Sequence, residues 1–119
     1  MIGVKEHSER RLRRNDRTLA VEIYRDGDGT IVVQLFGEFD LASVPTFGAE
    51  LARAEAELRP LVIDLSALEF IDSTGLSQLL AAHRRAEDDE RELVFLKGPP
   101  SVEKILRITG LDQILRFED

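Results

Sequence analysis

The fold of this chain is decided by the stretch LVIDLSALEFIDSTGLSQLL, residues 61–80. Its first part, an apolar run over 61–65, is typical of a buried strand. Its last part places leucines at helical spacing over 76–80. Between the two lies Asp-Ser-Thr-Gly at 72–75. The stretch therefore predicts a strand followed by a helix that begins with small polar residues, and α/β proteins place functional groups at such a point.

Further strands and helices are predicted on both sides of this stretch. Apolar residues over 19–23 and 31–36 predict two strands, and the glycine-rich link at 26–29 predicts a hairpin turn between them. This link does not match a calcium-binding EF-hand loop, because its sixth and twelfth positions are Ile31 and Gly37 instead of Gly and Glu. The order of strands and helices predicts an α/β fold with a mixed sheet of four to five strands and helices packed on it.

Local signals set the expected bounds of the other elements. A helix is expected from Val44 to Leu58, capped by Ser43 and ended by Pro60. The side chains that should form its buried stripe are Phe47, Leu51, Ala54 and Leu58. The remaining predicted elements are a strand over 61–65, a helix over 74–88, a strand over 93–96, a helix capped by Ser101 and stopped at Gly110, and a short strand or turn over 114–117.

Composition excludes several classes of function. The chain has 119 residues, a net charge of −7 and no cysteine. This length suits one domain, and the absence of cysteine excludes disulfide scaffolds and thiol catalysis. An acidic chain is a poor general binder of nucleic acid, which needs clustered Lys and Arg. No apolar run approaches the roughly 18 residues of a membrane span, and no signal peptide is recognised. We therefore expect a cytoplasmic protein that binds neither nucleic acid nor membranes.

The first 17 residues differ from the rest of the chain. They carry six basic residues and three acidic ones, a local net charge of +3: Lys5, Arg10, Arg11, Arg13, Arg14 and Arg17 against Glu6, Glu9 and Asp16. A polar, arginine-rich segment with few apolar residues cannot offset the entropy cost of ordering. We therefore expect residues 1–17 to form a disordered leader and residues 18–119 to form the folded domain.

Ser73 is the side chain whose chemistry needs explaining. A serine nucleophile requires a general base and an oxyanion hole. The two histidines are poorly placed for this, because His7 lies in the leader and His83 lies farther along the same predicted helix. There is also no glycine loop for phosphate and no metal-ligand pattern, so neither a catalytic site nor a cofactor is predicted. A second interpretation is simple capping of the helix by Asp72, Ser73 or Thr74, and spacing alone leaves it open.

Several separated motifs together resemble one family. FIDSTGL at 70–76 resembles the signature of the STAS domain, specifically of bacterial anti-sigma factor antagonists. The other matching stretches, in the family's order, are GEFD at 37–40, GPPSV at 98–102, TGL at 109–111 and ILRF at 114–117. The resemblance covers nearly all of residues 19–118. It implies a STAS-like fold and a regulatory binding protein that is not an enzyme.

The resemblance also implies a mechanism. In this family the unphosphorylated antagonist binds an anti-sigma factor, which is a serine kinase, and thereby frees the sigma factor. The kinase then phosphorylates a serine that by position is Ser73, Thr74 being the neighbour that is usually spared, and a PP2C-type phosphatase restores the serine. The implied partner-binding residues are Asp72, Ser73, Thr74, Gly75, Leu76, Asp40 and Glu38. The molecule itself needs no cofactor and is expected to be a monomer or a weak dimer.

Two other functions remain as alternatives. STAS domains also occur as soluble subunits of lipid-transporting ABC complexes, where the start of the same helix contacts the transporter and phosphorylation plays no part. A small hydrolase with Ser73 as nucleophile belongs to a different class. The acidic body of the chain and the intact Asp-Ser-Thr-Gly-Leu at 72–76 favour the antagonist.

Overall fold

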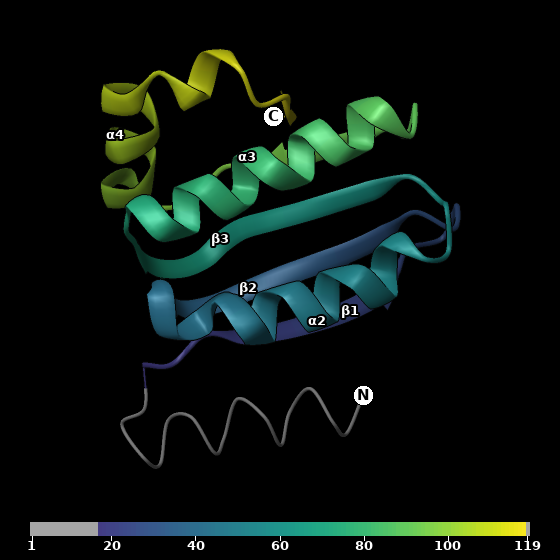
Figure 1. The fold of residues 1–119 in the computed structure, drawn as a ribbon, viewed down its shortest axis with the longest axis horizontal. Coiled ribbons are helices and arrows are strands. Elements are labelled where there is room, and N and C mark those ends of the chain that lie inside the picture. Colours follow the sequence, from purple (N-terminus) through teal and green to yellow (C-terminus); the bar gives the residue numbers. More distant parts are fainter. Residues whose placement is uncertain (1–16, 119) are drawn as a thin grey trace.

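Five strands form one sheet in the order β1-β2-β3-β4-β5 (Figure 1). The computed structural model describes residues 17–118, so the predicted leader lies outside the described residues except for Arg17. The strands are β1 (Ala20–Arg25), β2 (Ile31–Phe39), β3 (Leu61–Ile71), β4 (Leu93–Leu96) and β5 (Phe117–Glu118). β1 and β2 pair antiparallel, whereas β2, β3, β4 and β5 pair parallel. The predicted mixed α/β sheet is confirmed.

The predicted hairpin turn joins β1 to β2. Asp26 N–H donates to the carbonyl of Thr30 at 3.0 Å, and Thr30 N–H donates to Oδ1 of Asp28 at 2.9 Å. Hydrogen bonding with the Asp26 side chain, and then with the backbone of Thr30, lowers the pKa of Asp28 to about 2. Gly29 adopts a φ of 90°, in the left-handed region that favours glycine. The link is therefore an ordinary tight turn held by its own polar groups.

The helices supply the parallel crossovers. They are α2 (Val44–Glu55), α3 (Ser73–Asp88) and α4 (Pro100–Thr109), with two short 3-10 turns, η1 (Leu41–Ser43) and η2 (Leu111–Gln113). α2 and α3 contact one another and lie along the sheet, and α4 packs against β3 (Figure 1). Gly110 ends α4 with a φ of 80°, the predicted left-handed stop. The predicted cap Ser101 was wrong, because the helix already begins at Pro100 and its N-cap is Pro99. No helix in the range 17–118 is long and apolar enough to cross a membrane.

An aliphatic core with three phenylalanines fills the space between helices and sheet. Phe39 of β2 and Phe47 of α2 have ring centroids 4.6 Å apart, and both side chains are almost fully buried. The other largest fully buried side chains are Phe95, Ile31, Leu35, Leu51, Leu61, Ile63, Leu65, Leu68, Ile71 and Leu79. This core fixes the end of β2 against the start of α2, close to the predicted functional residues.

β3 is six residues longer than the predicted strand over 61–65. Opposite β2 it carries two extra residues, since Gln34 pairs with Asp64 but Phe36 with Ala67, and Gly37 pairs with Leu68 but Glu38 with Phe70. Each irregularity shifts the alternation of buried and exposed side chains by one residue. The period of two that identifies a strand is therefore lost beyond residue 65, and the continuation of β3 was not predictable from it.

Two expectations about α2 were wrong. The helix ends at Glu55 instead of Leu58, and Leu58, with a φ of 56°, is 76% exposed and lies outside the buried stripe. Pro60 restricts only Arg59, the residue directly before it, whereas the carbonyl of the last helical residue, Glu55, accepts from Nη2 of Arg91 at 2.8 Å. Ser43 stands at the predicted cap, but its hydroxyl bonds Glu38 O and Asp40 Oδ1, both at 3.0 Å, instead of a helix amide.

Candidate functional site at the start of α3

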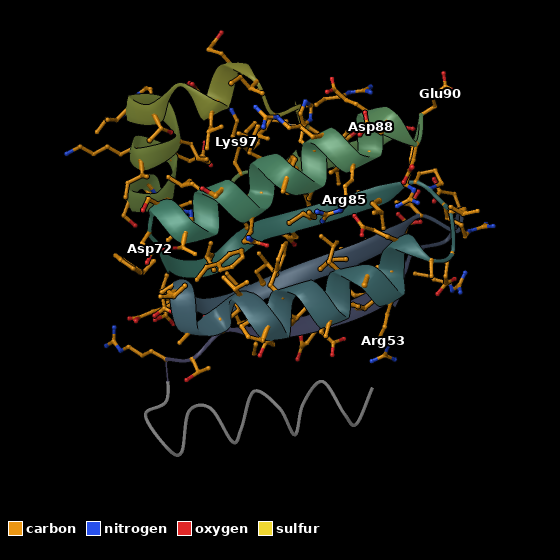
Figure 2. The ribbon with its side chains drawn as sticks, in the orientation of Figure 1. Arg53, Asp72, Arg85, Asp88, Glu90 and Lys97 are labelled. Atoms are coloured by element: carbon orange, nitrogen blue, oxygen red, sulfur yellow. The ribbon has the colours of Figure 1, made fainter. Side chains whose placement is uncertain are left out.

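The carboxyl ends of β2 and β3 bring two predicted site residues to the same edge of the sheet. Phe39 pairs with Ile71 at the last residues of the two strands. Asp40 and Asp72 follow directly, and Asp72 N–H donates to Phe39 O at 3.1 Å. Figure 2 shows Asp72 at this end of the molecule and Glu90 at the opposite end. The site is therefore built where two parallel strands end and a helix begins.

Asp72 is the residue that caps α3. Its Oδ1 accepts from Gly75 N–H at 3.0 Å, and its extended backbone, with φ −107° and ψ −174°, is that of an N-cap. Capping was predicted for Asp72, Ser73 or Thr74 without a choice among them. Since the carboxylate of Asp72 takes this role, the hydroxyl of Ser73 is not needed for it.

Ser73 occupies the first position of α3 and is exposed. Its carbonyl accepts from Ser77 Oγ at 3.0 Å. Within the part of the chain that the structure describes, its own hydroxyl forms no hydrogen bond. The neighbouring Thr74 is half-buried. Ser73 thus presents, among the described residues, a hydroxyl without a hydrogen-bond partner at a helix N-terminus. The free amides and the helix dipole favour a negative charge there.

Gly75 and Leu76 are buried, and their position explains the shape of the site. A Cβ on Gly75 would lie 2.7 Å from Cγ1 of Ile71 and 2.9 Å from Phe39 O. Leu76 is 6% exposed and belongs to the core. These two residues seat the first turn of α3 directly on the ends of β2 and β3, which holds Asp72 and Ser73 at the surface.

Replacing Asp72 by Ala is expected to lower the free energy of unfolding by about 1 kcal/mol, because the capping bond to Gly75 N–H is lost. Asp72→Asn keeps an oxygen acceptor and is the matched control. Urea titration of the two variants and the wild-type chain measures the difference. Equal stability of Asp72→Ala and wild type would contradict the role of Asp72 as cap.

Four carboxylates lie at or just beyond the ends of β2 and β3, and we call them the acidic rim: Glu38, Asp40, Glu69 and Asp72. Arg17 lies among them, with Nη1 3.6 Å from Oε2 of Glu38 and 3.9 Å from Oε1 of Glu69. Its carbonyl also accepts from Glu38 N–H at 2.8 Å. Arg17 was assigned to the leader from the sequence, yet the structure places it against β2.

Two exposed apolar side chains at this edge were missed by sequence reasoning. Leu41, in the turn after β2, is 71% exposed, and Phe70, near the end of β3, is 44% exposed. Phe70 is paired with Glu38 across the two strands, and Leu41 follows Asp40 directly. Their apolar character was visible, but their exposure depends on the irregular register of β3 and on the turn η1. Exposed apolar groups ringed by charge are typical of a protein-binding surface.

The hydrolase interpretation finds no support in the geometry. His83 stands on α3 ten residues after Ser73, which at the rise of an α-helix is roughly 15 Å along the axis. Its Nε2 lies 3.4 Å from Oε2 of Glu87, one turn farther on. His7 lies outside the described residues. His83 therefore cannot serve Ser73 as a general base.

Comparison with known proteins gives the family. Residues 21–119 match the model of the STAS domain. The chain belongs to this family. The anti-sigma-F factor antagonist RsfB of Mycobacterium tuberculosis is 30% identical over 93 residues, which are 77% of this chain and 75% of that protein.

Solved structures of STAS proteins share the fold. An anti-sigma factor antagonist from Mycobacterium paratuberculosis is 29% identical, with a TM-score of 0.76 over 85% of this chain and 86% of that one. The antagonist SpoIIAA is 24% identical, with TM-scores of 0.68 for its unphosphorylated form and 0.63 for its phosphorylated form. These matches cover 84% of this chain, and 89% and 92% of the SpoIIAA chains. The sheet with its three helices is the SpoIIAA-like STAS fold.

Proposed function

We propose that this STAS protein is an anti-sigma factor antagonist that is switched by phosphorylation of Ser73. In its unphosphorylated form it binds an anti-sigma factor with serine kinase activity and releases the sigma factor; phosphorylation ends the binding. One observation carries the proposal: Ser73 presents an exposed, uncommitted hydroxyl at the start of α3, while Asp72 alone caps the helix. The names of the relatives support it, and SpoIIAA, which has the same fold, has been solved in a phosphorylated form.

The fold should tolerate a phosphate on Ser73. A phosphoserine adds about −1.5 to −2 charges at pH 7. At the first position of α3 these charges meet the positive end of the helix dipole, an interaction of roughly 0.3–1 kcal/mol in their favour. Because Ser73 is exposed and its hydroxyl holds no neighbour in place within residues 17–118, modification breaks no contact of the free molecule.

A docked partner, in contrast, should be repelled. The phosphate would stand next to Asp72 and near the rest of the acidic rim, so the interface would have to desolvate several like charges at once. Desolvating a poorly compensated charge costs several kcal/mol, and each 1.4 kcal/mol changes an affinity about tenfold. Binding can therefore fall by orders of magnitude while the fold stays the same.

The partner surface in this proposal combines polar and apolar residues. Asp72, Ser73 and Thr74 face the partner from the start of α3, and Asp40 and Glu38 lie beside them at the end of β2. Gly75 and Leu76 are buried and contribute indirectly, because they pack the first turn of α3 against the ends of β2 and β3. ATP and magnesium belong to the kinase, and a PP2C-type phosphatase removes the phosphate, so the chain acts as a substrate and binding protein.

The experiment that tests this function is a pull-down from host lysate with Ser73→Ala and Ser73→Asp baits, followed by mass spectrometry. A kinase-like anti-sigma factor that is captured by Ser73→Ala and not by Ser73→Asp supports the switch. An ABC transporter subunit captured by both baits would contradict it and would assign the chain to the alternative class. Incubation of the captured kinase with ATP should then label wild type and Thr74→Ala, but not Ser73→Ala.

Leu41→Ala and Phe70→Ala are each expected to weaken partner binding about tenfold, because exposed apolar side chains at the centre of an interface carry much of its energy. In the free molecule Leu41 is 71% exposed and Phe70 is 44% exposed, so stability should change little for Leu41→Ala and should fall modestly for Phe70→Ala, which removes partly covered apolar area. Matched controls are Leu58→Ala (76% exposed) and Tyr24→Ala (44% exposed), which lie away from the site. Calorimetric titration of the partner measures the affinities, and equal losses in the controls would refute this surface.

A further inference from the structure

We propose that Ser43 is a positioning residue of the partner surface, whose buried hydroxyl holds the turn after β2 in the shape that presents Asp40 and Leu41. Ser43 is only 1% exposed, so it does not meet a partner itself. It acts through Asp40, which caps η1, and through Leu41, the first residue of η1. That this turn faces a partner rests on the proposed function; the hold of Ser43 on the turn does not.

The hydroxyl of Ser43 reaches both ends of the turn. Its Oγ lies 3.0 Å from the carbonyl oxygen of Glu38, near the end of β2, and 3.0 Å from Oδ1 of Asp40. Asp40 N–H donates back to the same Oγ at a longer 3.5 Å. Ser43 N–H donates to Asp40 O at 3.0 Å, so backbone and side chain close the same loop. One buried oxygen therefore ties the end of β2 to the start of α2.

Leu41 depends on this loop for its position. Its side chain is 71% exposed, so burial of its apolar surface does little to fix it. The backbone on both sides of it is held instead, because Asp40 before it and Ser43 after it are bonded to each other. A hydrogen bond to a carboxylate is among the stronger kinds, and a buried polar group that loses its partner costs the full desolvation. Removal of the hydroxyl should therefore release Asp40 and Leu41 together.

The hydroxyl has one proton and two acceptors, which suits a surface that changes its contacts. In the free molecule it can donate to the carboxylate of Asp40 or to the carbonyl of Glu38, since both lie at 3.0 Å. When a cation of a partner pairs with Asp40, the hydroxyl still has the carbonyl of Glu38 as acceptor. No buried donor is then left unsatisfied. Ser43 thus holds the turn without competing for the carboxylate that the partner needs.

The start of α3 is held by different hydrogen bonds. Asp72 N–H donates to Phe39 O at 3.1 Å, and Gly75 N–H donates to Oδ1 of Asp72 at 3.0 Å. Ser43 takes part in neither bond. The partner surface therefore has two halves that are fixed independently, and loss of the Ser43 hydroxyl should disturb the turn while Ser73 stays in place.

Ser43→Ala tests the hold on the turn in the free, full-length protein. Relaxation of the backbone amide nitrogens measures motion on the picosecond to nanosecond timescale. We expect Leu41 to be as rigid as β2 in the wild type and mobile in Ser43→Ala, with Ser73 unchanged. Ser43→Cys is similar in size, but its thiol is a weak donor, so it should behave like Ser43→Ala. A rigid Leu41 in Ser43→Ala overturns the proposal, and wild-type rigidity in Ser43→Cys does so by showing that volume shapes the turn.

Phosphorylation of Ser73 by the anti-sigma factor kinase tests the positioning role. Ser43→Ala should raise KM about tenfold, because two surface contacts lose their fixed geometry, and should leave kcat unchanged. Ile63→Val is the control for lowered stability alone, since Ile63 is fully buried and pairs with Val33 near the other end of β2. This control should keep the wild-type KM.

Three results of the kinase assay contradict the proposal: an unchanged KM in Ser43→Ala, a fall in kcat instead of a rise in KM, or an equal rise in KM for Ile63→Val. If no kinase phosphorylates the wild type at Ser73, the proposed function fails. The mobility of Leu41 then still decides whether Ser43 holds the turn, because that measurement needs no partner.

Discussion

Ser73→Asp is expected to weaken binding of the cognate anti-sigma factor by about a hundredfold, a difference of about 2.8 kcal/mol at 1.4 kcal/mol per decade. The melting temperature should stay the same or rise slightly. Affinity and melting temperature respond differently because the new carboxylate is exposed to water in the free molecule and is removed from water only in the complex. In the free molecule it is solvated and meets the favourable end of the helix dipole.

Ser73→Asn is the control for size, because it has the same shape as Ser73→Asp without the charge. We expect Asn to reduce the affinity far less than Asp. Isothermal titration at two salt concentrations gives the affinities, and differential scanning calorimetry gives the melting temperatures. A fall of several degrees in the melting temperature of Ser73→Asp would instead make Ser73 a structural residue of the helix start. Equal losses for Asn and Asp would show that bulk, not charge, operates the switch.

Gly75→Ala is expected to lower the free energy of unfolding by about 2 kcal/mol, since overpacking a filled site typically costs 1–3 kcal/mol. The added Cβ would meet Cγ1 of Ile71 at 2.7 Å, and both Phe39 O and Phe39 Cγ at about 3 Å. Phe39 O cannot move away cheaply, because it accepts the hydrogen bond from Asp72 N–H that ties α3 to β2. This clash should exceed the gain of roughly 1 kcal/mol that Ala has over Gly inside a helix.

Gly48→Ala in α2 is the matched control. A Cβ on Gly48 would have no neighbour within 4 Å, and the residue is exposed. This variant should therefore be more stable than wild type by roughly 0.5–1 kcal/mol. Urea unfolding of both variants measures the contrast. If Gly75→Ala is as stable as Gly48→Ala, the close approach of α3 to the ends of β2 and β3 is incorrect.

Much of the candidate site could be predicted because its signals are local. The apolar run over 61–65 and the leucines over 76–80 indicated a strand and a helix, and capping chemistry placed small polar residues between them. The position of Ser73 on the first turn of α3 follows from these local patterns. Which of Asp72, Ser73 and Thr74 caps the helix did not follow, since all three side chains carry an acceptor and only the geometry selects one.

Other features depended on contacts between distant residues. The exposure of Leu41 and Phe70 results from the turn η1 and from two extra residues in β3, neither of which leaves a periodic pattern in the sequence. The end of α2 at Glu55 likewise involves a distant residue, because the carbonyl of Glu55 accepts a hydrogen bond from Nη2 of Arg91. The place of Arg17 between Glu38 and Glu69 required β1, β2 and β3 to be assembled first.

The sequence by itself determined the fold class, the strand–turn–helix unit around Ser73 and the contrast between a basic leader and an acidic body. These features arise from periodicity, capping and composition, which act within a few residues of the chain. Only the tertiary structure decided which side chains share a surface: it joined the ends of β2 and β3, assigned the cap to Asp72, exposed Leu41 and Phe70, and set Arg17 against the acidic rim. Such neighbours are brought together by strand register and close packing, and both depend on residues far apart in the sequence.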